Sequence, residues 1–419
     1  MDNAPDHDTS SSEMIIFVAL ITFTLFGSGF YLGLRYSPLA PVSEAVRPVL
    51  WAGLFVVLGL IWISQPLYRA LVPYDHSGMA AKFLRVTFVA MGFFTMLLIL
   101  TLPGHLLETL IERLPWIRTA RAFAPGGSLS EERREWLSGV LRASTLGASF
   151  LGTWLGYRHA QAGPVVEEVV VPLKGLSSEF EGVRIAQISD LHVGPTIGPE
   201  EVDRIIDLTL SAKPDLIVLT GDLVDGTIPQ LRHVTDRLSR LKAPLGVFFI
   251  TGNHEYFWNA TAWIDYWRAM GFHYLDNSHV VLERPAANRA GRLGQLVLAG
   301  VPDHMSPQFG HATGPDPKRA LSGAPESVPS VILVHQPKGI HAAEEAGASL
   351  QLSGHSHGGQ FFPWSFFVRF AHPYYRGLHL HRGRTWIYVN RGTTYWGPPN
   401  RLGIPSEISL ITLKNSSTV

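Results

Sequence analysis

Five short polar motifs stand at the ends of apolar, β-branched runs in the second half of the sequence. All of them contain carboxylate, imidazole or amide side chains, which bind divalent cations such as manganese, iron and zinc. One such motif is common by chance, whereas five in this order, each closing an apolar run, indicate a shared metal site. The candidate ligands are Asp190 and His192, then Asp222, Asn253 and His335, and finally His355 and His357.

The apolar runs before these motifs have the length and composition of buried β-strands. Polar stretches separate them, as in residues 198–214, where apolar residues recur at helical spacing. This alternation predicts an α/β domain with sheet covered on both faces, and such sheets bind ligands beyond the carboxyl ends of their strands. The predicted strands are residues 183–189, 215–220, 246–251, 330–335, 349–354 and 385–390.

The sequence contains no cysteine, so a metal site must use oxygen and nitrogen ligands. Two divalent cations that share one carboxylate lie about 3.5–4 Å apart, where they polarise a phosphoryl oxygen and lower the pKa of a water between them. We expect His254, next to Asn253 in the motif GNHE, to donate a proton to the leaving oxygen. Asp225 either caps a turn or orients His254, and we favour the second interpretation.

The series DLH, GDLVD, GNHE, a lone histidine and GHSHGGQ resembles the calcineurin-like metallophosphoesterase superfamily over about residues 165–412. The last box is similar to the GHTHGGQ box of bacterial membrane-anchored members. The resemblance implies a sandwich of two mixed sheets flanked by helices, and two divalent cations. It implies Asp190, His192 and His357 as ligands of one cation, Asn253, His335 and His355 as ligands of the other, Asp222 as the shared carboxylate, and His254 as a proton donor held by Asp225.

The closing motif YVNRGTTYWG also resembles this family, except that Thr394 stands where a smaller residue, often glycine, is expected. The departure concerns the local shape of the pocket, because all the expected ligands are present. Asn390 and Arg391, at the end of the last predicted strand, are candidates for binding the substrate phosphate or for supporting a ligand.

The first third of the sequence has the character of a membrane region. A helix needs about 20 apolar residues to cross a bilayer, and three uncharged stretches approach or exceed that length. Ahead of them lies a polar tail, residues 1–13. The three stretches are residues 14–34, 49–67 and 86–102.

A fourth stretch, residues 136–157, contains Arg142 and is either a further span or an interfacial helix. We favour a span, which gives a multi-pass membrane region over residues 14–157. With four spans, the lysines and arginines of the loops predict that the domain that follows lies outside the cytoplasm. If the fourth stretch does not cross, that domain is cytoplasmic instead.

These features predict a membrane-anchored hydrolase of a phosphate mono- or diester, including a lipid-linked one. The bilayer and the phosphoester are the expected partners, whereas 34 basic and 34 acidic residues give no general attraction to nucleic acid. One alternative is an enzyme like UDP-2,3-diacylglucosamine diphosphatase of lipid A synthesis, which needs an inward-facing domain. The other is a non-catalytic membrane receptor or scaffold, which the loss of a ligand would favour.

Overall fold

The computed structural model describes residues 8–37, 44, 46–71, 78–113, 131–285, 293–311 and 313–416. The chain divides into two compact units, Met1–Trp154 and Leu155–Val419. Residues 1–7 of the predicted tail lie outside the described residues. The helices of the first unit are α1 (Asp8–Tyr36), α2 (Arg47–Leu71), α3 (Met79–Arg113) and most of α5 (Glu131–Ala162), which continues into the second unit.

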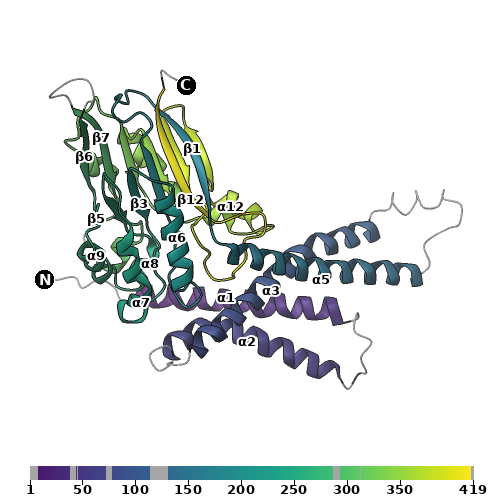
Figure 1. Ribbon diagram of the computed structural model, residues 1–419. Coiled ribbons are helices and arrows are strands. Elements are labelled where there is room, and N and C mark those ends of the chain that lie inside the picture. Colours follow the sequence, from purple (N-terminus) through teal and green to yellow (C-terminus); the bar gives the residue numbers. More distant parts are fainter. Residues whose placement is uncertain are drawn as a thin grey trace, which may run out of the picture. The chain divides into compact units, whose positions relative to one another are not determined.

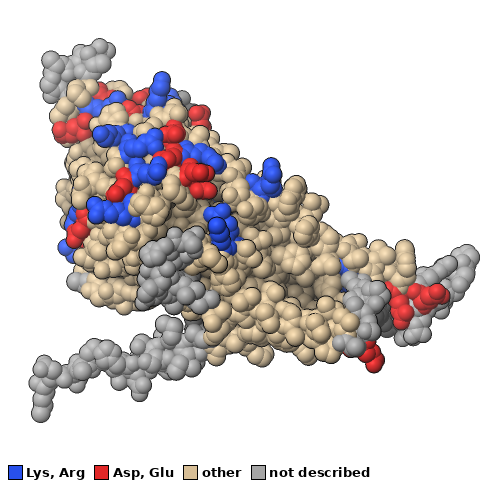
Figure 2. Space-filling view, turned by 60° about the horizontal axis from the view of Figure 1, so that its bottom comes forward, with Lys and Arg blue, Asp and Glu red and all other residues tan. Residues whose placement is uncertain are grey.

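Long helices form at all four stretches that the sequence marks as apolar. Within the described residues, α2 and α3 each contain a window long and apolar enough to cross a membrane, Arg47–Ser64 and Met79–Thr109. Figure 2 shows that much of this unit's surface is free of charged side chains. Spans at residues 14–34 in α1 and at 136–157 in α5 stay predictions.

The second unit is built on two six-stranded mixed sheets (Figure 1). In the first sheet, β2, β3, β4 and β5 are parallel, and in the second β7, β8, β9 and β11 are parallel. The first sheet has the order β1 (Val165–Leu173), β12 (Glu407–Asn415), β2 (Arg184–Ile188), β3 (Leu216–Thr220), β4 (Val247–Ile250) and β5 (His273–Tyr274). The second has the order β10 (Gly377–His381), β11 (Thr385–Val389), β9 (Leu350–Ser353), β8 (Ser330–Leu333), β7 (Leu293–Gly300) and β6 (Ser278–Pro285).

Strand β3 shows why the sheets stack in layers. Its side chains alternate between faces, as the geometry of a strand requires. Leu216 and Val218 belong to the apolar cluster between the two sheets, whereas Ile217 and Leu219 belong to the cluster under the helices of the first sheet. Both faces are buried, which explains the unbroken apolar runs in the sequence.

Helices cover the outer face of each sheet. The residues of α6, α7 and α9 complete the apolar cluster on the first sheet, and α10 and α11 complete a smaller one on the second. The predicted α/β sandwich of two mixed sheets flanked by helices is therefore confirmed. The helices are α6 (Pro199–Ser211), α7 (Ile228–Thr235), α8 (Asn253–Phe257), α9 (Ala260–Ala269), α10 (Pro317–Ala320), α11 (Ile340–Glu345) and α12 (Ser365–Ala371), with short 3-10 helices η4 (Asp236–Arg240), η5 (Ser306–Phe309), η6 (Pro337–Gly339) and η7 (His357–Gly359).

Candidate metal centre

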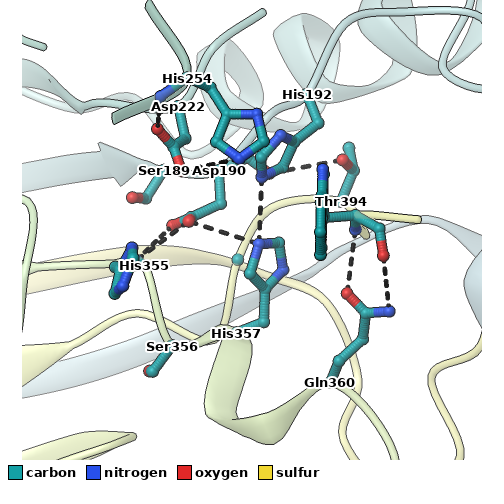
Figure 3. A network of polar contacts seen from close by, with 12 residues as sticks. Ser189, Asp190, His192, Asp222, His254, His355, Ser356, His357, Gln360 and Thr394 are labelled. Carbon is teal, nitrogen blue, oxygen red and sulfur yellow. Dashed lines mark hydrogen bonds and ion pairs between the residues drawn. The ribbon is translucent and has the colours of Figure 1, made fainter. Parts of the chain in front are cut away.

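The predicted ligands follow strands of both sheets, and six of them form two groups of three. Figure 3 shows the first group beside Asp222 and His355 of the second. In the first group, Asp190, His192 and His357 each offer one ligand atom, and these atoms all lie within 4.8 Å of one another. The Nε2 atoms of His192 and His357 are 3.1 Å apart, and His357 Nε2 is 3.4 Å from Asp190 Oδ1. All three side chains are buried.

The second group consists of Asp222, His335 and His355, whose ligand atoms also lie within 4.8 Å of one another. Asp222 Oδ2 lies 3.1 Å from His335 Nε2. Asn253 is the first residue of α8, and the backbone N–H of the next residue, His254, donates to Asp222 Oδ1 at 2.8 Å. Residues that follow β4, β8 and β9 thus lie close to the carboxylate of Asp222, which itself follows β3.

The backbone at the site is held in an unusual conformation. Five of the predicted ligands have φ between 44° and 68°, which costs a non-glycine residue about 1–3 kcal/mol and commonly marks functional sites. A Cβ atom on Gly354 would lie 2.2 Å from Asp190 Oδ2, so only glycine fits here. This close approach lets the backbone N–H of His355 donate to Asp190 Oδ1 at 2.9 Å. The five residues are Asp190, His192, Asp222, His355 and His357.

Two atoms at the site are available to bind a cation because they have no hydrogen-bond partner. His335 Nδ1 donates to the carbonyl of Thr220 at 2.7 Å, which leaves Nε2 as the ring nitrogen that faces Asp222. Among the described residues, this Nε2 and Asn253 Oδ1 are buried without a hydrogen-bond partner. Oxygen and imidazole donors without thiolate are the set that divalent first-row cations accept. The residues present therefore fit divalent metal ions.

The electrostatics of the imidazoles agree with this fit. Burial and the neighbouring His335 lower the pKa of His355 to about 3, and burial and Arg401 lower the pKa of His357. Both rings are thus neutral at neutral pH, as a metal-bound imidazole must be. Burial opposes protonation of His335 too, but Asp222 raises its pKa, so protons and cations would compete for Nε2.

Asp225 contacts two imidazoles rather than one. Its Oδ1 lies 2.5 Å from His254 Nδ1, and its Oδ2 lies 3.2 Å from Nδ1 of His192. Burial lowers the pKa of His254, but Asp222 and Asp225 together raise it to about 9, so this ring keeps a proton at neutral pH. The carboxylate therefore lies beside the predicted proton donor, as expected, and also beside a predicted ligand, which the sequence did not indicate.

Two further residues support the ligands from outside the predicted set. Arg401 is fully buried, and it donates to the carbonyls of His357 at 3.1 Å and Arg391 at 2.8 Å, with a nitrogen 3.1 Å from His357 Nδ1. Glu255 accepts from three backbone N–H groups, including that of Asp222 at 3.0 Å. No pattern in the sequence pointed to Arg401. Glu255, in contrast, is the last residue of the motif GNHE, and its burial beside the preceding strand ends could have been expected.

Asn390 and Arg391 direct their polar atoms into the protein. Asn390 is fully buried and donates to Ser409 Oγ at 2.6 Å. Arg391 pairs with Glu407 and, at 2.8 Å, with Glu167. These contacts support the end of β11 beside the metal ligands, and substrate contact by either residue stays a prediction.

Comparison with known proteins agrees with this geometry. A sequence profile of the calcineurin-like phosphoesterase family matches residues 183–359. A Danio rerio protein named "transmembrane protein with metallophosphoesterase domain" is 36% identical over 270 residues, covering 62% of this chain and 60% of that protein. The Bos taurus protein of the same name is 32% identical over 334 residues, covering 78% and 73%. A Helicobacter pylori metallophosphoesterase is 29% identical over 403 residues, covering 96% and 98%.

Proposed function

The chain belongs to the calcineurin-like phosphoesterase family, and on that premise we propose that it hydrolyses a phosphate mono- or diester with two divalent cations. The family assignment confirms the resemblance of the motifs and identifies a metal-dependent phosphoric ester hydrolase. The observation that carries the proposal is the meeting of two ligand groups at one edge of the sandwich.

Asp190, His192 and His357 would hold one cation. His335, His355 and Asn253 would hold the other, with Asp222 shared between them. When bound, such a pair polarises a phosphoryl oxygen and makes water nucleophilic. The chain's own contribution is to fix these ligands: Asp190 accepts the His355 N–H, and Asp222 accepts that of His254.

We assign the proton donor to His254, oriented by Asp225. Its Nδ1 is occupied by the Asp225 carboxylate, so the proton on Nε2 is available to a leaving oxygen. The Nε2 atom lies 4.0 Å from Asp222 Oδ2, which keeps the donor next to the cation position. A donor held in this way would assist departure of the ester oxygen without further movement of the ring.

We place this activity at a membrane surface. Relatives named as transmembrane proteins and the apolar helices α2 and α3 support membrane association. A multi-pass anchor, a catalytic domain outside the cytoplasm and a lipid-linked substrate are our proposals. A reporter enzyme fused after Val419, active on only one side of the membrane, tests the sidedness.

The proposed activity is tested by turnover of soluble phosphomonoester and phosphodiester substrates by the purified full chain. Manganese, magnesium, iron and zinc are compared, with His357→Ala as the inactive control. We expect turnover that depends on an added divalent cation and is lost in the variant. Turnover that persists equally in His357→Ala would show that another site or a contaminant is responsible.

A further inference from the structure

An exposed aromatic segment follows directly after the histidine box, over residues 362–370. It contains α12, in which none of the side chains is buried. Phe370, on the last turn of this helix, is 72% exposed. Soluble surfaces rarely expose so many large apolar side chains in one place. The exposed members are Phe362, Trp364, Phe366, Phe367 and Phe370.

The exposure of this segment does not come from fraying. The backbone N–H of Phe362 donates to the carbonyl of Leu402 at 2.8 Å, and Phe361 just before it is buried. The rings also touch one another, since the centroids of Phe366 and Phe367, and of Phe366 and Phe370, are each 5.6 Å apart. The segment is thus a fixed, continuous apolar surface.

The charged side chains in this part of the sequence are of one sign. Between Glu345 and Glu407 the sequence contains no aspartate or glutamate. The guanidinium of Arg369 lies 3.9 Å from the ring centroid of Phe366, and Arg376 follows the helix. Among the described residues, neither arginine is paired with a carboxylate. Aromatic rings mixed with unpaired arginines are the composition of protein surfaces at the boundary between lipid headgroups and acyl chains.

One loop of the second unit connects the aromatic segment to the end of α5. The loop at residues 400–402 binds the segment through Leu402 and binds the end of α5 through Arg401, whose backbone N–H donates to the Gly156 carbonyl at 2.9 Å. A Cβ atom on Gly156 would overlap the Asn400 side chain, so helix and loop are in close contact. The aromatic segment and the last residues of α5 therefore contact the same loop of the second unit.

We propose that residues 362–370 form a lipid-contacting surface that rests in the headgroup region of an anionic bilayer. The rings of Phe366, Phe367 and Phe370 would enter the boundary with the acyl chains, and Arg369 would contact lipid phosphates. Because the segment begins five residues after His357, this contact holds the metal centre at the membrane surface. That last consequence rests on the proposed function, whereas the lipid contact does not.

The absence of cysteine allows a site-specific test in the full chain. The variant F367C is labelled with an environment-sensitive fluorophore and reconstituted into vesicles of phosphatidylethanolamine and phosphatidylglycerol. A lipid with a nitroxide near its headgroup is the quencher. The matched control is D265C, on the exposed side of α9, where Asp265 has a side-chain exposure of 71%.

We expect strong quenching and a blue shift at position 367, little change at position 265, and weaker quenching in vesicles without phosphatidylglycerol. Equal quenching at the two positions, or none at position 367, overturns the proposal. Turnover of a soluble phosphoester by the labelled F367C protein is measured in parallel. Quenching without turnover would refute the proposed function and support the lipid contact. Turnover without quenching would refute the lipid contact and support the proposed function.

Discussion

Replacing Asp225 by asparagine tests how one carboxylate supports two imidazoles. Asp225 gives one oxygen to His254 Nδ1 at 2.5 Å and the other to His192 Nδ1 at 3.2 Å. An amide has a single acceptor oxygen, and its NH₂ group only donates hydrogen bonds. Asparagine of nearly the same shape must therefore leave one of the two imidazoles without an acceptor.

The size of the effect follows from the kind of contact that is lost. A hydrogen bond to a charged group contributes about 1.5–3 kcal/mol, which is about 10- to 150-fold in rate when the bond supports the transition state. If His254 loses its partner, kcat falls by this factor and metal affinity is retained. If His192 loses its partner, metal affinity also falls. The expected loss is about 10- to 100-fold, which is usual when a residue that orients a metal ligand is removed.

Steady-state turnover of a soluble phosphoester and titration with manganese separate these two results. Asp207→Asn is the matched control, because Asp207 is exposed and pairs with a surface arginine, Arg240. His254→Gln and the double variant with Asp225→Asn are measured alongside. If Asp225 acts through His254, the double variant is no slower than His254→Gln. Unchanged turnover together with unchanged manganese affinity in Asp225→Asn would refute the reasoning.

Three further predictions follow from the contacts of the site. Removing metal with a chelator should abolish turnover and lower the thermal unfolding midpoint, and added manganese should restore both, because bound cations stabilise the folded state. Gly354→Ala should destabilise the domain by about 1–3 kcal/mol, as measured by unfolding, since its Cβ would lie 1.9 Å from Ser189 Oγ and 2.2 Å from Asp190 Oδ2. Arg401→Met should weaken metal binding by about 10- to 100-fold in a manganese titration, because the backbone carbonyl of His357 loses its donor.

The strands, and the meeting of six candidate ligands in two groups, could be predicted because both depend on short-range patterns. Continuous apolar runs such as residues 215–220 are required where both faces of a sheet are covered, and β3 forms there. The carboxyl ends of parallel strands share an edge, so polar residues that follow such runs come together without any knowledge of the loops. This is why Asp190 and Asp222, which follow the parallel neighbours β2 and β3, could be expected to meet.

Other parts of the structure depend on contacts between distant residues. Strand β1 pairs in parallel with β12, with Val165 opposite Glu407, and no local pattern indicates that pairing. Arg401 lies 44 residues beyond His357 in a loop rich in proline and glycine, where an arginine is normally exposed. Its burial depends on carbonyl groups that only the folded chain presents.

The central claim is that two cations share Asp222. It is tested most directly by anomalous diffraction at the manganese absorption edge, from crystals of the full chain grown with manganese. We predict two anomalous peaks, one on each side of the Asp222 carboxylate, one next to His192 and His357 and the other next to His335 and His355. A single peak, or peaks that do not contact Asp222, would contradict the account.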